Sequence, residues 1–233
     1  MDPAIATGFI WFVAFLFSTT VHEAMHALVA WKGGDPTAYH GGQVSLSPIP
    51  HIRREPIGML VVPLLTSLTQ GWAMGWASAP YDPVWAERHP RRAALMAAAG
   101  PAGNFIIAAI AFVLIKAGLI AGIFAAPASA NFSRVVVSAT AGDADFTATI
   151  LSVFLMLNVI LGAFNLLPLP PLDGGSVFSI FLPENVGRKL RELQGNGSFS
   201  IIGLLVAWRV FPYLTDPLFT AVLRLVHPGS SYE

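Results

Sequence analysis

Four long apolar runs constrain the fold of this chain more than any other feature. They cover residues 4–31, 93–124, 146–169 and 201–226, and a helix needs ~20 mostly apolar residues to cross the hydrocarbon core of a membrane. Pro212 and Pro217 interrupt the last run, so it could form one long helix or a hairpin of two short ones. These runs predict an all-α polytopic membrane protein.

The low charge of the chain excludes two broad classes of protein. Charged residues make up 11% of the sequence, whereas an average soluble domain carries about a quarter. The 13 Lys and Arg balance the 13 Asp and Glu and form no continuous basic stripe, so we expect no nucleic-acid partner. Because the sequence has no cysteine, any metal site must use His, Asp or Glu.

The organisation of the chain predicts a single integral-membrane domain over residues 1–233, because it has no internal repeat and no Ser/Gly-rich linker. We expect the core of this domain within about residues 5–185 and one or two C-terminal membrane helices within about 198–227.

A further apolar stretch, residues 57–76, contains Pro63, Gln70 and several glycines. We predict that it re-enters the membrane or forms a short membrane segment. If it dips in and returns, or crosses twice, the loop cations fall on one face, which is cytoplasmic by the positive-inside rule. These cations are Lys32, Arg53, Arg54, Arg88, Arg91, Arg92, Arg188, Lys189 and Arg191. Only Arg134 then lies in the opposite loop, and the N-terminus is expected outside the cytoplasm.

The first run contains His22-Glu23-Ala24-Met25-His26, which has the H-E-x-x-H spacing. Residues four apart share one face of a helix, so both imidazoles can bind one ion. Glu23 can take a proton from water that the metal acidifies and pass it to the leaving nitrogen. Ionisable side chains inside an apolar helix are costly to bury, which favours this interpretation over two histidines that only satisfy hydrogen bonds.

A third metal ligand must come from elsewhere, because a catalytic zinc usually has three protein ligands and an open position. The best candidate is Asp173, in the stretch 165–175 that follows the third run. Its prolines prevent a regular helix and its glycines allow a turn, so Asp173 can project inward. The alternative is an ordinary loop in which Asp173 caps a helix.

These motifs resemble those of the site-2 proteases, a family of intramembrane zinc peptidases. The resemblance rests on residues 22–26 and 165–175, on Gly100-Pro-Ala-Gly-Asn104, and on the stretch 41–76, which looks like the compact bacterial and archaeal branch without appended domains. It implies a three-helix catalytic core, one Zn²⁺ held by His22, His26 and Asp173, and Glu23 as catalytic base. Asn165 and Asn104 match family positions that bind substrate or stabilise the oxyanion.

The resemblance also implies a function and a location. We expect a zinc endopeptidase that cuts transmembrane or membrane-proximal protein segments in regulated intramembrane proteolysis. The expected location is a prokaryotic inner membrane, in contact with lipid, with the site nearer the cytoplasmic side. The alternatives are a zinc hydrolase of a non-peptide bond, for instance in a lipid head group, and a non-catalytic membrane binding protein.

The stretch between His40 and His51 is rich in glycine and alternates in polarity at residues 43–47. It predicts a small β element near 40–50 that could lie beside an extended substrate. Both histidines are expected to be surface residues, because the three-ligand site is already complete without them.

Overall fold

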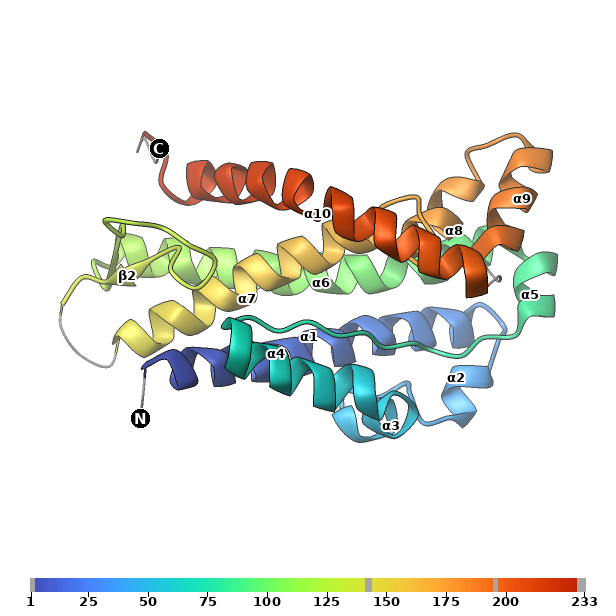
Figure 1. The fold of residues 1–233 in the computed structure, drawn as a ribbon, viewed down its shortest axis with the longest axis horizontal. Helices are drawn as coiled ribbons and strands as arrows, with labels where there is room; N and C mark the ends of the chain where they lie inside the picture. The colour runs from blue at the N-terminus through green and yellow to red at the C-terminus, as the bar shows by residue number, and fades with distance from the viewer. Residues whose placement is uncertain (1–2, 141–143, 195–196, 230–233) are drawn as a thin grey trace.

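Four long helices dominate the computed structural model, which describes residues 3–140, 144–194 and 197–229 (Figure 1). They are α1 (Pro3–Lys32), α6 (Pro90–Ile120), α7 (Ala144–Asn165) and α10 (Gly197–Val226). Within the described residues, each of these four is long and apolar enough to cross a membrane. The predicted all-α polytopic membrane fold is confirmed.

The C-terminal run forms one helix, although the sequence also allowed a hairpin. Pro212 and Pro217 both lie inside α10. Each proline removes one backbone donor from the helix, and the chain nevertheless continues in one general direction across the length of the molecule (Figure 1). The start of α1 and the end of α10 therefore lie at the same end of the bundle, as an even number of crossings requires.

The core of the bundle is the packing of α6 against α1 and α7. The faces of α6 that meet its neighbours are lined by small buried residues, namely Ala94, Ala97, Gly103, Ala108 and Ala111. Small side chains let helix backbones approach closely, which is the usual basis of packing between helices in membranes. Close approach here brings polar groups from all three helices within hydrogen-bonding range.

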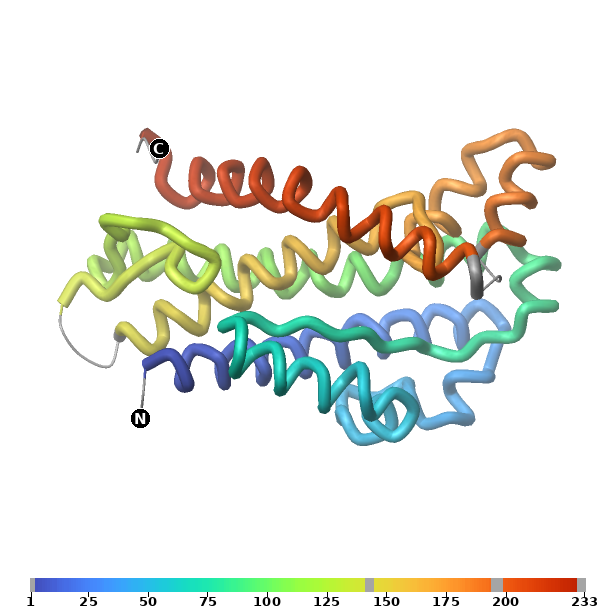
Figure 2. Tube along the Cα trace, in the orientation of Figure 1, coloured from blue at the N-terminus to red at the C-terminus, as the bar shows by residue number. Residues whose placement is uncertain are grey.

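The stretch 57–76 turns back on itself along the bundle. It begins with a π-helical turn, η1 (Ile57–Val61), which continues into α4 (Val62–Gln70). Gly71 ends α4 with a φ of 76°, a left-handed conformation that glycine adopts without strain. Residues 71–82, here called the returning segment, then run back in extended form along the bundle (Figure 2). The Trp76 N–H donates to Gly58 O at 3.1 Å and ties the two limbs together.

The prediction of a small β element near 40–50 is wrong. That stretch contains the end of α2 (Thr37–His40), a turn, and the start of α3 (Pro48–Arg54). Gly42 has a φ of 75°, and the Ser47 hydroxyl caps α3, so both ends of the alternating stretch are bent away from a strand. Gln43 is buried and donates to Ser78 O at 3.2 Å, which replaces the expected strand partner.

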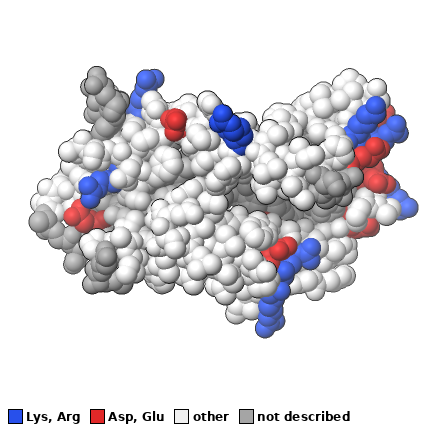
Figure 3. Space-filling view, viewed as in Figure 1, with Lys and Arg blue, Asp and Glu red and all other residues white. Residues whose placement is uncertain are grey.

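The strands in the described residues lie at the other end of the bundle. β1 (Phe124–Ala125) and β2 (Val137–Ser138) form a small antiparallel sheet between α6 and α7. The opposite end carries the short helices α5 (Pro83–Arg88), α8 (Asp173–Ser179) and α9 (Glu184–Gln194). Charged side chains gather at that end on the face shown in Figure 3.

Candidate metal centre

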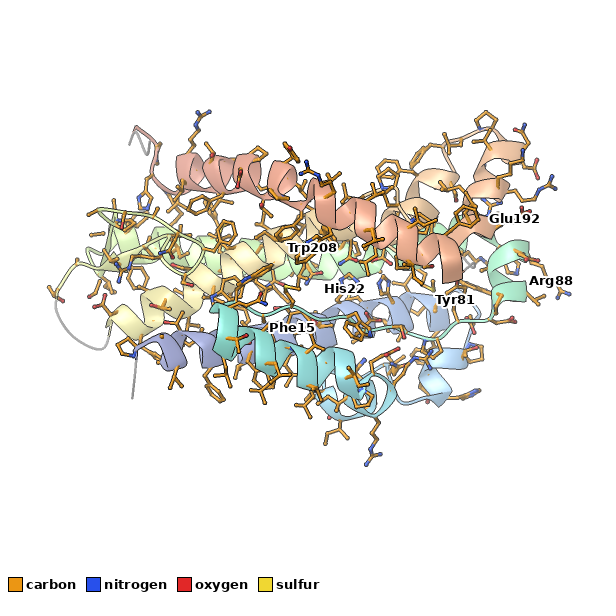
Figure 4. All side chains as sticks on the ribbon, in the orientation of Figure 1. Phe15, His22, Tyr81, Arg88, Glu192 and Trp208 are labelled. Atoms are coloured by element: carbon orange, nitrogen blue, oxygen red, sulfur yellow. The ribbon has the colours of Figure 1, made fainter. Side chains whose placement is uncertain are left out.

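The H-E-x-x-H residues lie in the second half of α1 and are buried, with His22, Glu23 and His26 each 5–7% exposed. One helical turn separates the two imidazoles, which meet edge to face with Nε2 atoms 2.9 Å apart. Their ligand atoms and the Glu23 carboxylate lie within 4.8 Å of one another. His22 lies deep between the helices (Figure 4).

The structure brings Asp173 to this pair, as the sequence predicted. Asp173 is the first residue of α8 and follows the proline-rich stretch 166–172. Its Oδ2 lies 3.2 Å from His22 Nε2 and its Oδ1 lies 3.3 Å from His26 Nε2. The Asp173 carboxylate thus faces both Nε2 atoms, and a carboxylate in this position can bind a cation together with them.

The other ring nitrogens of both histidines are held by α6. His22 Nδ1 lies 2.6 Å from Asn104 Oδ1, and His26 Nδ1 lies 2.7 Å from Met96 O. With these nitrogens donating, both Nε2 lone pairs face Asp173. Metal-binding histidines typically donate their second nitrogen to an oxygen in this way, which fixes the ring and its tautomer.

The donor atoms fit a tetrahedral metal ion. Two lone pairs 2.9 Å apart repel unless a cation lies between them, and the neighbouring carboxylate supplies the negative charge. Corners of a tetrahedron ~2.0–2.1 Å from a central zinc are ~3.3 Å apart, close to the observed nitrogen to oxygen distances. At Gly100 a Cβ would lie 2.5 Å from His22 Nε2 and would also overlap His26 Nε2, so the absence of a side chain there leaves space beside the donors.

Glu23 has a free carboxylate oxygen beside this cluster. Its Oε2 is buried and makes no hydrogen bond among the described residues. A buried carboxylate oxygen without a partner is costly, and an ion, a water molecule or a substrate group usually explains one. Glu23 therefore faces the space in which a reacting group would lie.

The two asparagines predicted near the site lie in different settings. Asn104 is fully buried; its Oδ1 accepts from His22 and its Nδ2 donates to Asn158 Oδ1 at 2.9 Å. Asn165 is the last residue of α7, and its Nδ2 donates to Leu161 O of its own helix at 3.0 Å. The amide of Asn104 is committed to protein partners, whereas Asn165 keeps a second N–H to donate.

Sequence reasoning missed Asn158 and Ser18, which complete a buried network behind His22. Asn158 Nδ2 donates to Ser18 Oγ at 2.9 Å, and both residues are fully buried. The signal in the sequence was the amide of Asn158, in the middle of the apolar run 146–169. Such a residue is costly in a membrane helix and points to a partner on a neighbouring helix.

The histidines outside the cluster have different environments. His40 is exposed, which confirms its prediction as a surface residue. The same prediction for His51 is wrong, because its side chain is 1% exposed and its Nε2 lies 3.1 Å from Ser45 O. The turn at residues 41–47 folds over α3 and covers the ring, which a sequence pattern for a strand could not anticipate.

Comparison with known proteins agrees with this geometry. The sequence model of peptidase family M50 matches residues 10–208. A protein of Bacillus subtilis (strain 168), named as the zinc metalloprotease YwhC, is 31% identical over 210 residues, which cover 90% of this chain and 85% of that protein. The chain is also 29% identical over 194 residues to a Mycolicibacterium smegmatis (strain ATCC 700084 / mc(2)155) protein named as the zinc metalloprotease Rip2. That match covers 82% of this chain and 64% of Rip2. No solved structure matches.

Proposed function

Because this chain belongs to peptidase family M50 and is a zinc metalloprotease of the membrane, we propose that it cuts peptide bonds in transmembrane or membrane-proximal segments of other proteins. This is the reaction of regulated intramembrane proteolysis. The observation that carries the proposal is the meeting of Asp173 with His22 and His26 inside a bundle of membrane-length helices. A hydrolytic centre at that position is suited to substrates that are themselves in the membrane.

We assign His22, His26 and Asp173 as the zinc ligands. Two neutral imidazoles and one carboxylate form a donor set typical of a catalytic zinc with an open position. When bound, zinc supplies a Lewis acid that polarises a carbonyl and acidifies water. The chain supplies the remaining groups: α6 fixes both imidazole rings, and α8 delivers the carboxylate.

Glu23 acts as the general base and then as the general acid. Its unpartnered Oε2 can accept a proton from the attacking water and return it to the nitrogen of the leaving peptide. The surrounding apolar helices limit the access of bulk water, so the proton stays within the site. Asn165, which has an amide N–H to spare, is our candidate for binding the substrate backbone or the oxyanion.

The substrate must be unwound before it is cut, because a helix hides its peptide groups in its own hydrogen bonds. The face in Figure 3 has a hollow between α10 and the returning segment. The returning segment is extended, and backbone edges of this kind can pair with an extended peptide. We propose that substrate approaches through this hollow and lies along the returning segment.

We further propose that the active site lies nearer the cytoplasmic face of a prokaryotic inner membrane. The turning back of residues 57–76 keeps the loop cations of α3, α5 and α9 on one side of the apolar bundle, as the positive-inside rule favours. Labelling of single cysteines introduced at Arg53 and Arg91 tests this topology. Opposite accessibility of the two positions across the membrane would contradict it.

The decisive test of the mechanism is Glu23→Gln. Purified protein is assayed for zinc content and for cleavage of a membrane-embedded peptide, with the exposed Glu87→Gln as control. We expect Glu23→Gln to retain zinc and to lose cleavage by ~10²–10⁴-fold, and Glu87→Gln to resemble the wild type. Unchanged cleavage in Glu23→Gln would refute the mechanism, and cleavage of lipid amides in place of peptides would refute the substrate class.

The ligand assignment has a separate test. Zinc content is compared between the wild type and the variants His22→Ala and Asp173→Ala, after equilibration with a weak chelator. Both variants should lose the ion, because each removes one of three ligands. Retention of stoichiometric zinc in either variant would remove that residue from the ligand set.

A further inference from the structure

We propose that Asn158 is a positioning residue that fixes the tautomer of His22 through Asn104, so that His22 Nε2 presents a lone pair to the metal. The inference rests on the proposed role of His22 as a zinc ligand. It concerns a chain of hydrogen bonds that links three helices: Ser18 and His22 on α1, Asn104 on α6 and Asn158 on α7. Ser18, Asn104 and Asn158 are all fully buried.

The direction of this chain is set by a backbone carbonyl. Asn158 Nδ2 lies 2.9 Å from Phe154 O, and a carbonyl oxygen can only accept. The amide of Asn158 must therefore direct its NH₂ group toward Phe154 and Ser18, and its Oδ1 toward Asn104. A flip of this amide would place two oxygens face to face.

The orientation of Asn158 dictates that of Asn104. Because Asn158 presents Oδ1, Asn104 must donate its Nδ2 across the 2.9 Å contact. The same Nδ2 also lies 3.5 Å from Ser18 O, a longer and weaker contact that favours the same orientation. Its remaining oxygen then lies 2.6 Å from His22 Nδ1 and can only accept. His22 Nδ1 must carry the proton, so Nε2 is left with a lone pair directed at Asp173.

The tautomer of His26 does not depend on a series of side-chain hydrogen bonds. Its Nδ1 donates directly to Met96 O, a backbone carbonyl whose polarity no substitution can reverse. The partner of His22 is an amide, which could present either end to the ring. The two imidazoles thus reach the same tautomer by different means, and only that of His22 depends on side chains from two other helices.

A purely structural role for the network makes a different prediction. Hydrogen bonds between membrane helices stabilise their packing, so loss of Asn158 would lower stability and change nothing else. A positioning role changes the tautomer of His22 and weakens metal binding, since loss of an outer-shell partner typically reduces metal affinity ~10- to 100-fold.

The test compares Asn158→Leu with Ser152→Ala. Ser152 is also fully buried on α7, where its hydroxyl accepts from the Val135 and Val136 N–H groups without touching His22. The tautomer of His22 is measured by ¹⁵N NMR of the metal-free protein, with the signal assigned by its loss in His22→Ala. Zinc affinity is measured by chelator competition, and stability by thermal unfolding.

We expect Asn158→Leu to populate the Nε2–H form of His22 and to bind zinc ~10-fold more weakly or worse. Ser152→Ala should keep the Nδ1–H form and wild-type zinc affinity while losing stability. If Asn158→Leu keeps both the Nδ1–H form and full zinc affinity, the proposal is overturned and the network is structural.

Asn104→Asp supplies a rescue. A carboxylate accepts from His22 Nδ1 in any orientation, so the double variant Asn104→Asp/Asn158→Leu should recover the Nδ1–H form and most of the zinc affinity. Failure to recover would show that Asn158 does not act through Asn104. Because the NMR readout needs no metal, it remains valid even if His22→Ala retains zinc, an outcome that would refute only the ligand assignment.

Discussion

The interface among α1, α6 and α7 and the packing of α10 are built differently. In their most apolar windows, 50% of the residues of α7 are buried but only 17% of those of α10. The three-helix interface holds both histidines, Glu23 and the polar network behind His22. At Gly203, α10 packs closely against Pro170, in the stretch that precedes Asp173. Groups that must be held rigidly lie where packing is tight, and the loosely packed helix lies where a large substrate would need room.

Gly100→Ala, in the tightly packed interface among α1, α6 and α7, should have the largest effect on zinc content and cleavage. A Cβ at this position overlaps Nε2 of both histidines, which α6 itself holds in place. We expect loss of stoichiometric zinc and of cleavage, measured by metal analysis and a peptide assay. Gly103→Ala on the same helix is the control. Its Cβ would lie 3.0 Å from the side chain of Met25, which is flexible, and at an ordinary contact distance of 3.5 Å from Val21. Wild-type zinc content in Gly100→Ala would mean that the imidazoles can move aside.

Gly203→Ala tests the close contact between α10 and the stretch before Asp173. The new Cβ would overlap Pro170 O, so α10 or the stretch before Asp173 must shift. We expect cleavage to fall ~10-fold, since small misplacements near a reacting centre can reduce rates up to ~100-fold, while zinc is retained. Leu205→Ala, which removes an exposed side chain of α10, is the control. A Gly203→Ala variant with full activity would show that α10 moves independently of the metal centre.

The sequence predicted the fold and the site where local rules apply. Run length identified α1, α6 and α7, and the spacing of His22 and His26 placed two ligands on one helical face. The meeting with Asp173 could be inferred only because zinc chemistry requires a third ligand. The requirement for a third ligand follows from the coordination number of zinc, so it could be stated without knowing where α8 lies.

What the sequence could not predict depends on contacts between distant segments. The role of Asn158 follows from one amide on α7 meeting another on α6, and neither position has a local signature. The strand expected near 40–50 failed because Gln43 finds its partner 35 residues away, at Ser78 O. Alternation of polarity describes a half-buried segment, but it does not supply a second strand to pair with.

Asp35→Asn tests the loop that ties the end of α1 to the returning segment. Asp35 is buried and accepts from the Thr37 N–H and hydroxyl and from the Asp82 N–H. Burial opposes ionisation, but these hydrogen bonds lower the pKa of Asp35 below its ordinary 3.8. Its contribution is therefore complete above about pH 4 and is lost as pH falls through the lower folded value.

We expect Asp35→Asn to lower stability by ~1–3 kcal/mol near neutral pH, because an NH₂ group replaces one of the two accepting oxygens and cannot accept the hydrogen bond made there. The difference from the wild type should shrink as the pH is lowered from about 5 toward 3. Thermal unfolding in detergent across that pH range measures it. A difference that stays constant would mean that the charge of Asp35 makes no contribution. Zinc content, measured in parallel at pH 7, should be unchanged.

Lys116→Met should have the smallest effect. It tests the contact between α6 and α10 at the end of α6 that is remote from the metal centre. Lys116 Nζ donates to Val226 O at 3.0 Å, so the cation caps the C-terminal end of α10. Its removal should cost ~0.5–1 kcal/mol of stability, as expected for a cation at a helix C-terminus. Lys116 lies ~24 Å along α6 from Gly100 at 1.5 Å per residue, so zinc content and cleavage should match the wild type. A loss of zinc in Lys116→Met would show that the far end of α10 controls the metal centre over that distance.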